Sequence, residues 1–137
     1  MQIPQIDRSN YLKGLLITAR KDNQLNEEEI SIIKRLSKSL GFSSDFFEET
    51  ISHLLENKYI TDEPIKFSDQ KIAKSFLEDG LALALSDRVI TKSEIGWLRQ
   101  TAKINNIENE WFNKKLEELQ SRNNRVSMPD FALLSII

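Results

Sequence analysis

Two pairs of acidic residues with the same internal spacing are the residues in this sequence best suited to chemistry. Asp22 precedes Glu29 at the same spacing at which Asp87 precedes Glu94. Carboxylate oxygens are the ligands that hard divalent cations prefer, and calcium loops carry acids at comparable spacings. The four carboxylates therefore define one hypothesis, a site for a divalent metal ion.

A standard calcium loop is nevertheless excluded by the residues that precede each pair. Such a loop needs oxygen ligands at its first and third positions when the glutamate takes the last position. In the second pair these two positions are Leu83 and Leu85, and in the first pair the third position is Arg20. Apolar and cationic side chains do not coordinate a hard cation, so neither segment is a calcium loop of that type.

The two glutamates have a structural interpretation that needs no ligand. Asn26 and Thr91 each stand three positions before a glutamate, which is the pattern of a capping box at a helix N-terminus. In this motif the cap side chain accepts a hydrogen bond from the glutamate's backbone amide, and the glutamate reaches back to the cap. Flanking apolar pairs add the hydrophobic staple that accompanies such caps: Leu25 with Ile30, and Ile90 with Ile95.

Asp22 and Asp87 are less well explained by helix capping. Each follows a predicted helix, where the negative end of the helix dipole disfavours an acid. An aspartate at that place can form a local Asx-turn or accept amides from the next helix. The alternative is that both aspartates bind a ligand or a partner.

The region around these acids recurs along the chain without a gap, at the constant offset that carries Asp22 onto Asp87. Other pairs at this offset keep their character, as with Phe46 and Trp111. We interpret the recurrence as a duplicated helical unit, with chance alignment of two amphipathic helix sets as the alternative. Identical pairs include Leu12/Leu77, Leu16/Leu81, Ala19/Ala84, Asp22/Asp87, Glu29/Glu94, Ile30/Ile95, Lys38/Lys103, Phe47/Phe112 and Leu54/Leu119.

Each unit is expected to form three helices, because apolar residues recur in it at helical spacing. We predict an all-α fold, a compact helical bundle of about seven helices in one domain over residues 1–137. The two pseudo-symmetric three-helix units occupy about 8–56 and 68–121. Gly41 and Asn106 end the second helix of each unit, since both residue types tolerate a left-handed C-cap. The helix around Leu77–Leu85 is apolar on most sides and is predicted to be central.

The segments outside the units carry their own predictions. Asp62 followed by Glu63 and Pro64 has the form of a helix N-cap with proline in the first turn. A closing helix is expected over about 128–136, with core closure or an interface contact as alternative roles for its apolar residues. Trp97 and Trp111 are candidate core residues, and Trp97 is the better candidate of the two for the alternative role of an exposed anchor. The apolar residues of the tail are Phe131, Leu134, Ile136 and Ile137.

Composition limits the class of protein. The chain has 137 residues, 39% of them hydrophobic and 29% charged, as is usual for a globular domain. A formal net charge of -2 argues against non-specific nucleic-acid binding. There is no cysteine, and neither a secretory signal nor a membrane-spanning run is visible in the sequence. A cytoplasmic location and no direct membrane span are the expectations.

The repeated pattern resembles the TerB-like family of tellurite-resistance and stress-response domains. The shared elements are an apolar helix ending in Ala-x-x-Asp, then a Leu or Ile, a cap residue, and Glu-Ile, each occurring twice between Leu12 and Leu119. Where the family usually has glycine after the aspartate, this chain has Asn23 and Arg88. The resemblance implies an all-α protein of the bacterial cytoplasm without catalysis. It also implies metal chelation by Asp22, Glu29, Asp87 and Glu94.

The expected function is that of a non-enzymatic interaction module of the stress-response type, with other proteins as partners. The alternative is a divalent-metal-binding or metal-sensing protein that uses the four acids. No catalytic constellation is apparent, because His53 is the single histidine and has no nucleophile pattern near it. The sequence does not indicate an oligomeric state.

Overall fold

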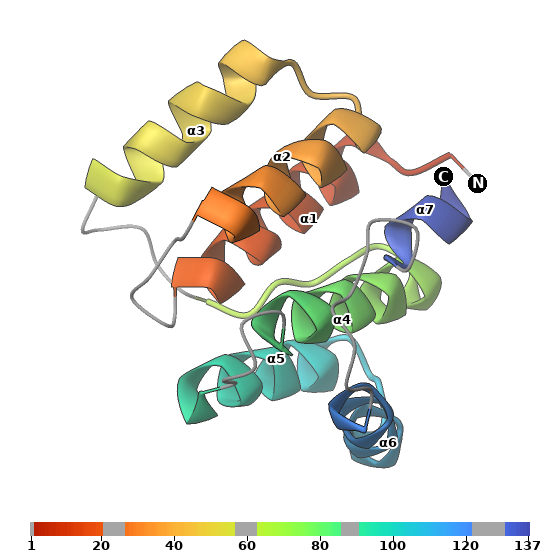
Figure 1. The fold of residues 1–137 in the computed structure, drawn as a ribbon. Coiled ribbons are helices and arrows are strands. Elements are labelled where there is room, and N and C mark those ends of the chain that lie inside the picture. Colours follow the sequence, from red (N-terminus) through yellow and green to blue (C-terminus); the bar gives the residue numbers. More distant parts are fainter. Residues whose placement is uncertain (1, 21–26, 57–62, 86–90, 122–130) are drawn as a thin grey trace.

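The structure is a computed structural model that describes residues 2–20, 27–56, 63–85, 91–121 and 131–137. Within these ranges the chain forms seven helices and no strand, so the predicted all-α bundle is confirmed (Figure 1). The helices are α1 (Gln5–Arg20), α2 (Glu27–Ser39), α3 (Ser44–Glu56), α4 (Gln70–Leu85), α5 (Lys92–Ile104), α6 (Asn109–Gln120) and α7 (Leu133–Ile136).

The helix bounds follow the offset found in the sequence. α4 begins and ends at the counterparts of the first and last residues of α1, and α5 does the same with respect to α2. α6 begins at the counterpart of the first residue of α3. The backbone also has a positive φ at both predicted helix ends, 97° at Gly41 and 59° at Asn106. These residues therefore act as the left-handed caps that the sequence predicted. That the two units arose by duplication stays a prediction.

α1 and α4 form the centre of the bundle, because each buries most of its surface. Among the helix pairs, these two make the most extensive contact. On one side α2 packs on α1 and α3 covers α2, while on the other side α5 and α6 pack on α4 (Figure 1). The prediction that the helix around Leu77–Leu85 is central is thus confirmed, and α1 shares that position.

Glycines in α1 and α4 allow the helices to approach closely. A Cβ atom added at Gly14 would lie 2.5 Å from two ring carbons of Phe76, and one added at Gly80 would lie 2.8 Å from Cδ2 of Leu98. Phe76 and Leu98 are fully buried, so neither side chain has space to withdraw. The absence of a side chain at these two positions therefore fixes the spacing between neighbouring helices.

Trp97 is part of this core, so the core role is confirmed for this tryptophan and the alternative role of an exposed anchor is wrong. Its side chain is buried, and its ring meets that of Phe76 edge to face with 6.1 Å between centroids. Tyr11 meets the same phenylalanine edge to face at 5.5 Å. Aromatic rings favour such edge contacts, so the three residues form a buried aromatic row across α1, α4 and α5.

The segment before α4 is extended, and the prediction of a helix N-cap around Asp62–Pro64 is wrong for its described part. Residues 63–67 are not helical. Their backbone groups bond to the buried side chain of Asn105, whose Nδ2 donates to the carbonyl of Ile65 at 2.7 Å and whose Oδ1 accepts from the amide of Phe67 at 2.8 Å. The side chain of Asp7 likewise accepts from the amide of Ser68 at 3.0 Å. Asp62 lies outside the described residues.

The closing helix exists but is shorter than predicted. α7 spans Leu133–Ile136, while residues 128–130 lie outside the described part of the chain. Phe131 and Ile136 are buried as expected for core closure, whereas Leu134 is partly exposed and Ile137 is half exposed. Leu133 takes the fully buried position instead. Core closure is therefore confirmed for Phe131 and Ile136, and it is wrong for Ile137.

The close approach of α1 and α4 generates a stability prediction. Gly14→Ala should lower the free energy of unfolding by about 1–3 kcal/mol, because the added methyl group must displace buried ring atoms of Phe76. Gly96→Ala is the matched control, since nothing lies within 4 Å of a Cβ atom there. That change should raise the free energy by roughly 0.5–1 kcal/mol through helix propensity. Urea unfolding measures both values, and equal stability of the two variants would contradict the assigned contact.

Candidate functional site

The structure describes only half of the predicted acid set. Glu29 and Glu94 are buried at the starts of α2 and α5, whereas Asp22 and Asp87 lie outside the described residues. The part of the chain that is described contains no group of three or more His, Cys, Asp or Glu side chains able to hold a metal ion. Chelation by the four acids therefore stays a prediction.

The capping box of the second unit is confirmed. The amide of Glu94 donates to Oγ1 of Thr91 at 3.1 Å, and Oε1 of Glu94 accepts from the amide of Thr91 at 3.0 Å. The Thr91 hydroxyl also donates to Oε1 at 3.0 Å. The Glu94 carboxylate is thus engaged by its own helix start. In the first unit, the predicted cap residue Asn26 lies outside the described residues, and so does its staple partner Leu25.

Stability measurements with and without metal can distinguish a capping role of Thr91 and Glu94 from a metal site. Thr91→Ala should lower the free energy of unfolding by about 1 kcal/mol, because an orphan amide of α5 loses its acceptor. The loss should be the same in a chelator and in Ca²⁺, Mg²⁺, Mn²⁺ or Zn²⁺, as measured by thermal unfolding. Ser93→Ala, at an exposed position of the same helix start, is the control. A metal-dependent stabilisation that disappears in the Asp22→Asn, Asp87→Asn double variant would instead support chelation.

A buried carboxylate that sequence reasoning missed lies at the centre of the bundle. Asp79 of α4 is 1% exposed, and its carboxylate accepts hydrogen bonds from the Tyr11 hydroxyl and from the amides of Ala132 and Leu133. The amide of Leu133 lies 3.0 Å from Oδ2. Asp79 therefore joins α1, α4 and the start of α7. The sequence signal that could have indicated this role is an acid just before the apolar run Leu81–Leu85 of α4.

Burial raises the pKa of Asp79 from 3.8 to about 7, since the charged form loses its hydration. The hydrogen bonds from Tyr11, Ala132 and Leu133 act against this rise, and the neighbouring charge of Glu78 adds to it. The pKa of Tyr11 is raised as well, first by burial and then by the charge of Asp79. The hydrogen bonds of this carboxylate join α4 to α1 and to the start of α7, which supports a structural role.

This carboxyl group predicts how stability depends on pH. Because the pKa is higher in the folded state, the folded protein holds a proton that the unfolded chain releases. The contribution is complete below about pH 4 and is lost as the pH rises through about 7. At about 1.4 kcal/mol per pKa unit, the free energy of unfolding should fall by at most about 4 kcal/mol over this range. Asp79→Asn should remove this slope in urea unfolding at several pH values.

The control for the pH experiment is Glu49→Gln, an exposed position on α3. This variant should show the same dependence of the free energy of unfolding on pH as the unchanged protein. A slope that persists in Asp79→Asn would show that another group carries the pH dependence.

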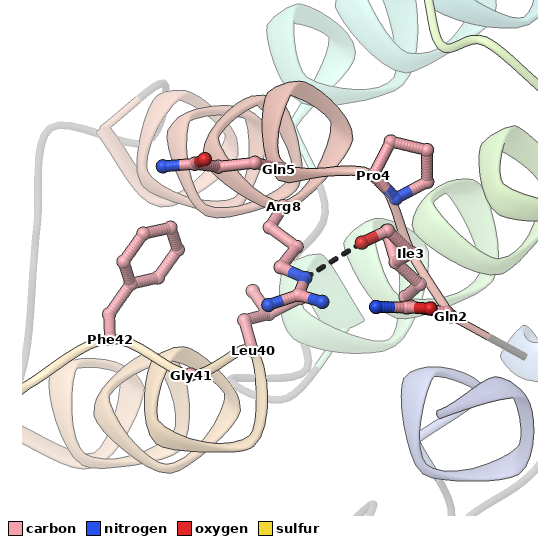
Figure 2. Close-up of a pocket in the computed structure, with 8 residues that line it drawn as sticks. All are labelled: Gln2, Ile3, Pro4, Gln5, Arg8, Leu40, Gly41 and Phe42. Atoms are coloured by element: carbon pink, nitrogen blue, oxygen red, sulfur yellow. Dashed lines mark hydrogen bonds between the residues drawn. The ribbon is translucent and has the colours of Figure 1, made fainter.

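A surface groove lies where the N-terminal segment meets the turn between α2 and α3 (Figure 2). It has a volume of about 600 Å³ and is lined by Gln2, Ile3, Pro4, Gln5, Arg8, Leu40, Gly41 and Phe42. A second hollow of about 370 Å³ shares Arg8 and other residues with the first and adds Ser39 and Ile137. The two hollows share five lining residues and together form one groove around Arg8, which we call the Arg8 groove.

Arg8 is fixed within this groove by one hydrogen bond. Its Nε donates to the carbonyl of Ile3 at 2.8 Å, as Figure 2 shows. No described residue accepts a hydrogen bond from the two terminal nitrogens of the guanidinium. A guanidinium offers its donors in a planar fork that matches a carboxylate or phosphate. The groove therefore holds a partly buried cation in a fixed position, and the terminal N–H groups of this cation can donate to an anion.

The walls of the Arg8 groove combine apolar surface with amide groups. Leu40 and Phe42 come from the turn that ends α2, and Gly41 gives this turn its positive φ. The carboxamides of Gln2 and Gln5 flank Arg8 from the N-terminal side (Figure 2). Such a surface suits an extended chain that carries an acid beside an apolar residue. Apart from Arg8, no titratable side chain among the described residues lines either hollow.

Comparison of the chain with protein-family models, curated proteins and solved structures gives no match. The resemblance to TerB-like domains therefore stays a prediction, and the site must be judged from its own geometry. Among the described residues, no helix is both long and apolar enough to cross a membrane.

Proposed function

We propose that this chain is a non-enzymatic interaction module that binds an extended, carboxylate-bearing segment of another protein in the Arg8 groove. The observation that carries the proposal is the guanidinium of Arg8, which is held by Ile3 and whose two terminal nitrogens have no acceptor among the described residues. A bidentate pair with a carboxylate would satisfy both nitrogens at once.

The shape of the groove supports a peptide rather than a compact small molecule. The two hollows share Arg8, and their lining extends to Phe42 in one hollow and to Ile137 in the other. Phe42 stacks on Phe46, with 5.0 Å between ring centroids, and Phe46 is 45% exposed. An apolar side chain next to the bound acid would cover part of this aromatic surface.

The proposed biological role and the class of partner are inferred from the sequence. The resemblance to TerB-like domains favours a stress-response role in the bacterial cytoplasm. The formal net charge of -2 favours a protein partner over nucleic acid. Metal sensing through Asp22, Glu29, Asp87 and Glu94 is the alternative function, and the chelator experiment above addresses it.

The proposal can be tested by selecting peptides from a random display library on the full chain. We expect the enriched peptides to share an acidic residue, or a terminal carboxylate, next to an apolar one. Calorimetric titration of these peptides should show affinity about tenfold weaker for Arg8→Gln, because a charge-assisted hydrogen-bond pair is lost. Arg8→Lys should recover only part of the affinity, since lysine lacks the planar fork.

Lys13→Gln is the matched control, because this exposed lysine lies on α1 outside the groove. It should bind the selected peptides as the unchanged chain does. Selection of peptides without acids, or equal affinity for Arg8→Gln, would reject the groove as the binding site. Turnover of a small molecule by the purified chain would reject the non-enzymatic assignment.

A further inference from the structure

We propose a second site, for a phosphate group, in a pocket between the end of α2 and the start of α3. The pocket has a volume of about 220 Å³, and we call it the serine pocket. It stands independently of the proposed peptide site, apart from the wall that Phe42 provides to both. Its lining residues are Ser31, Lys34, Arg35, Ser37, Lys38, Phe42, Ser43, Ser44 and Phe47.

The charge of the serine pocket favours an anion. Its lining includes three cationic side chains, and none of the described lining residues is acidic. Lys34 forms an exposed ion pair with Glu48 at 3.2 Å, whereas neither Arg35 nor Lys38 has an ion-pair partner among the described residues. Positive charge is therefore concentrated at one hollow of a protein with a net charge of -2. An oxyanion in the pocket would neutralise it.

The hydroxyl of Ser37 is an independent sign of a missing ligand. Ser37 is 1% exposed, and its Oγ is buried with no hydrogen-bond partner among the described residues. Buried polar atoms are almost always paired, and leaving one unpaired costs free energy. An anion oxygen in the serine pocket would give this hydroxyl an acceptor.

The start of α3 supplies further donors on the opposite wall. Oγ of Ser43 accepts from the amide of Phe46 at 3.1 Å, which leaves its own hydroxyl proton free to donate. The first amides of an α-helix have no acceptor within the helix, so the amides of Ser44 and Asp45 are further donors at this helix start. A helix start attracts anions through these amides and its dipole. Asp45 is exposed and is not part of the pocket lining.

The second unit carries different side chains at the corresponding junction. At the offset that relates the two units, Lys34 corresponds to Arg99, whose guanidinium donates to Oδ1 of Asn109 at 2.5 Å and of Asn113 at 2.6 Å. The guanidinium also lies 4.8 Å from the ring centroid of Phe112. The counterparts of Arg35 and Ser37 are the uncharged residues Gln100 and Ala102.

The two units therefore differ in what completes the junction between their second and third helices. In the second unit, Arg99 joins α5 to the start of α6 through two hydrogen bonds. In the first unit, Lys34 makes the counterpart of one of these contacts, an exposed ion pair with Glu48 at 3.2 Å, and a hollow lined by cations and by Ser37 lies beside it. A tetrahedral oxyanion of the phosphate type accepts hydrogen bonds from all of these donors at once.

The source of the phosphate group is either free inorganic phosphate or a phosphorylated side chain, and one experiment distinguishes them. The ¹⁵N-labelled full chain is titrated with sodium phosphate at constant ionic strength, and separately with a phosphoserine peptide and its unphosphorylated form. We expect the amide signals of Ser43, Ser44 and Asp45 to shift with a phosphate-bearing probe. A response to both probes assigns free phosphate, and a response to the peptide alone assigns a phosphorylated segment.

The variants test the cationic donors and the hydroxyl donor separately. Arg35→Gln with Lys38→Gln should weaken binding by about tenfold or more, through the loss of charge-assisted contacts. Ser37→Ala should weaken it by about two- to tenfold without lowering the unfolding temperature, because its hydroxyl has no partner among the described residues. Lys103→Gln with Lys114→Gln removes the same charge from exposed positions of the second unit and should leave affinity unchanged.

Two results would overturn the phosphate site. One is the absence of any shift at the start of α3 with either phosphate-bearing probe. The other is equal weakening in the two charge-matched double variants, since this would show a general effect of charge.

Discussion

The contact between α1 and α4 depends on the absence of a side chain at Gly14, where the ring of Phe76 occupies the space. This contact sets the distance across the centre of the bundle. At that distance the Tyr11 hydroxyl of α1 reaches Asp79 of α4, and Asp79 in turn reaches the first amides of the closing segment. Asp7 of α1 also reaches Ser68, just before α4. The buried hydrogen bonds between these elements therefore depend on the close apolar contact between α1 and α4.

Much of the helical architecture could be predicted, because it depends on local patterns. Apolar spacing located the helices, and Gly41 and Asn106 marked two helix ends through their tolerance of positive φ. The extended segment before α4 could not be predicted in the same way. Its local residues favour a helix start, but its backbone groups are bonded by Asn105, which lies far along the chain from Ile65. A distant side chain therefore decides the local structure.

The candidate sites differ in the same way: those formed by neighbouring residues could be predicted, and those formed across elements could not. The capping box at Thr91 and Glu94 lies within one short stretch of consecutive residues, so its pattern was visible in the sequence. The Arg8 groove requires the N-terminal segment to meet the turn after α2, and no local pattern signals that meeting. Asp79 was missed in the sequence, because its partners on α1 and before α7 are known only from the folded chain. Side chains that act across elements are those that sequence analysis missed.

The position of α4 also has a consequence for synthesis of the chain on the ribosome. α1 ends at Arg20, but the helix that covers its inner face is complete only at Leu85. At about 5–20 residues per second, the translating ribosome needs roughly 3–13 seconds to make the segment between these two points. During that interval the apolar side chains of α1 that pack against α4 lack their partner, while α2 and α3 already have local neighbours. The nascent chain therefore exposes an apolar helix surface until the bundle around α4 can close.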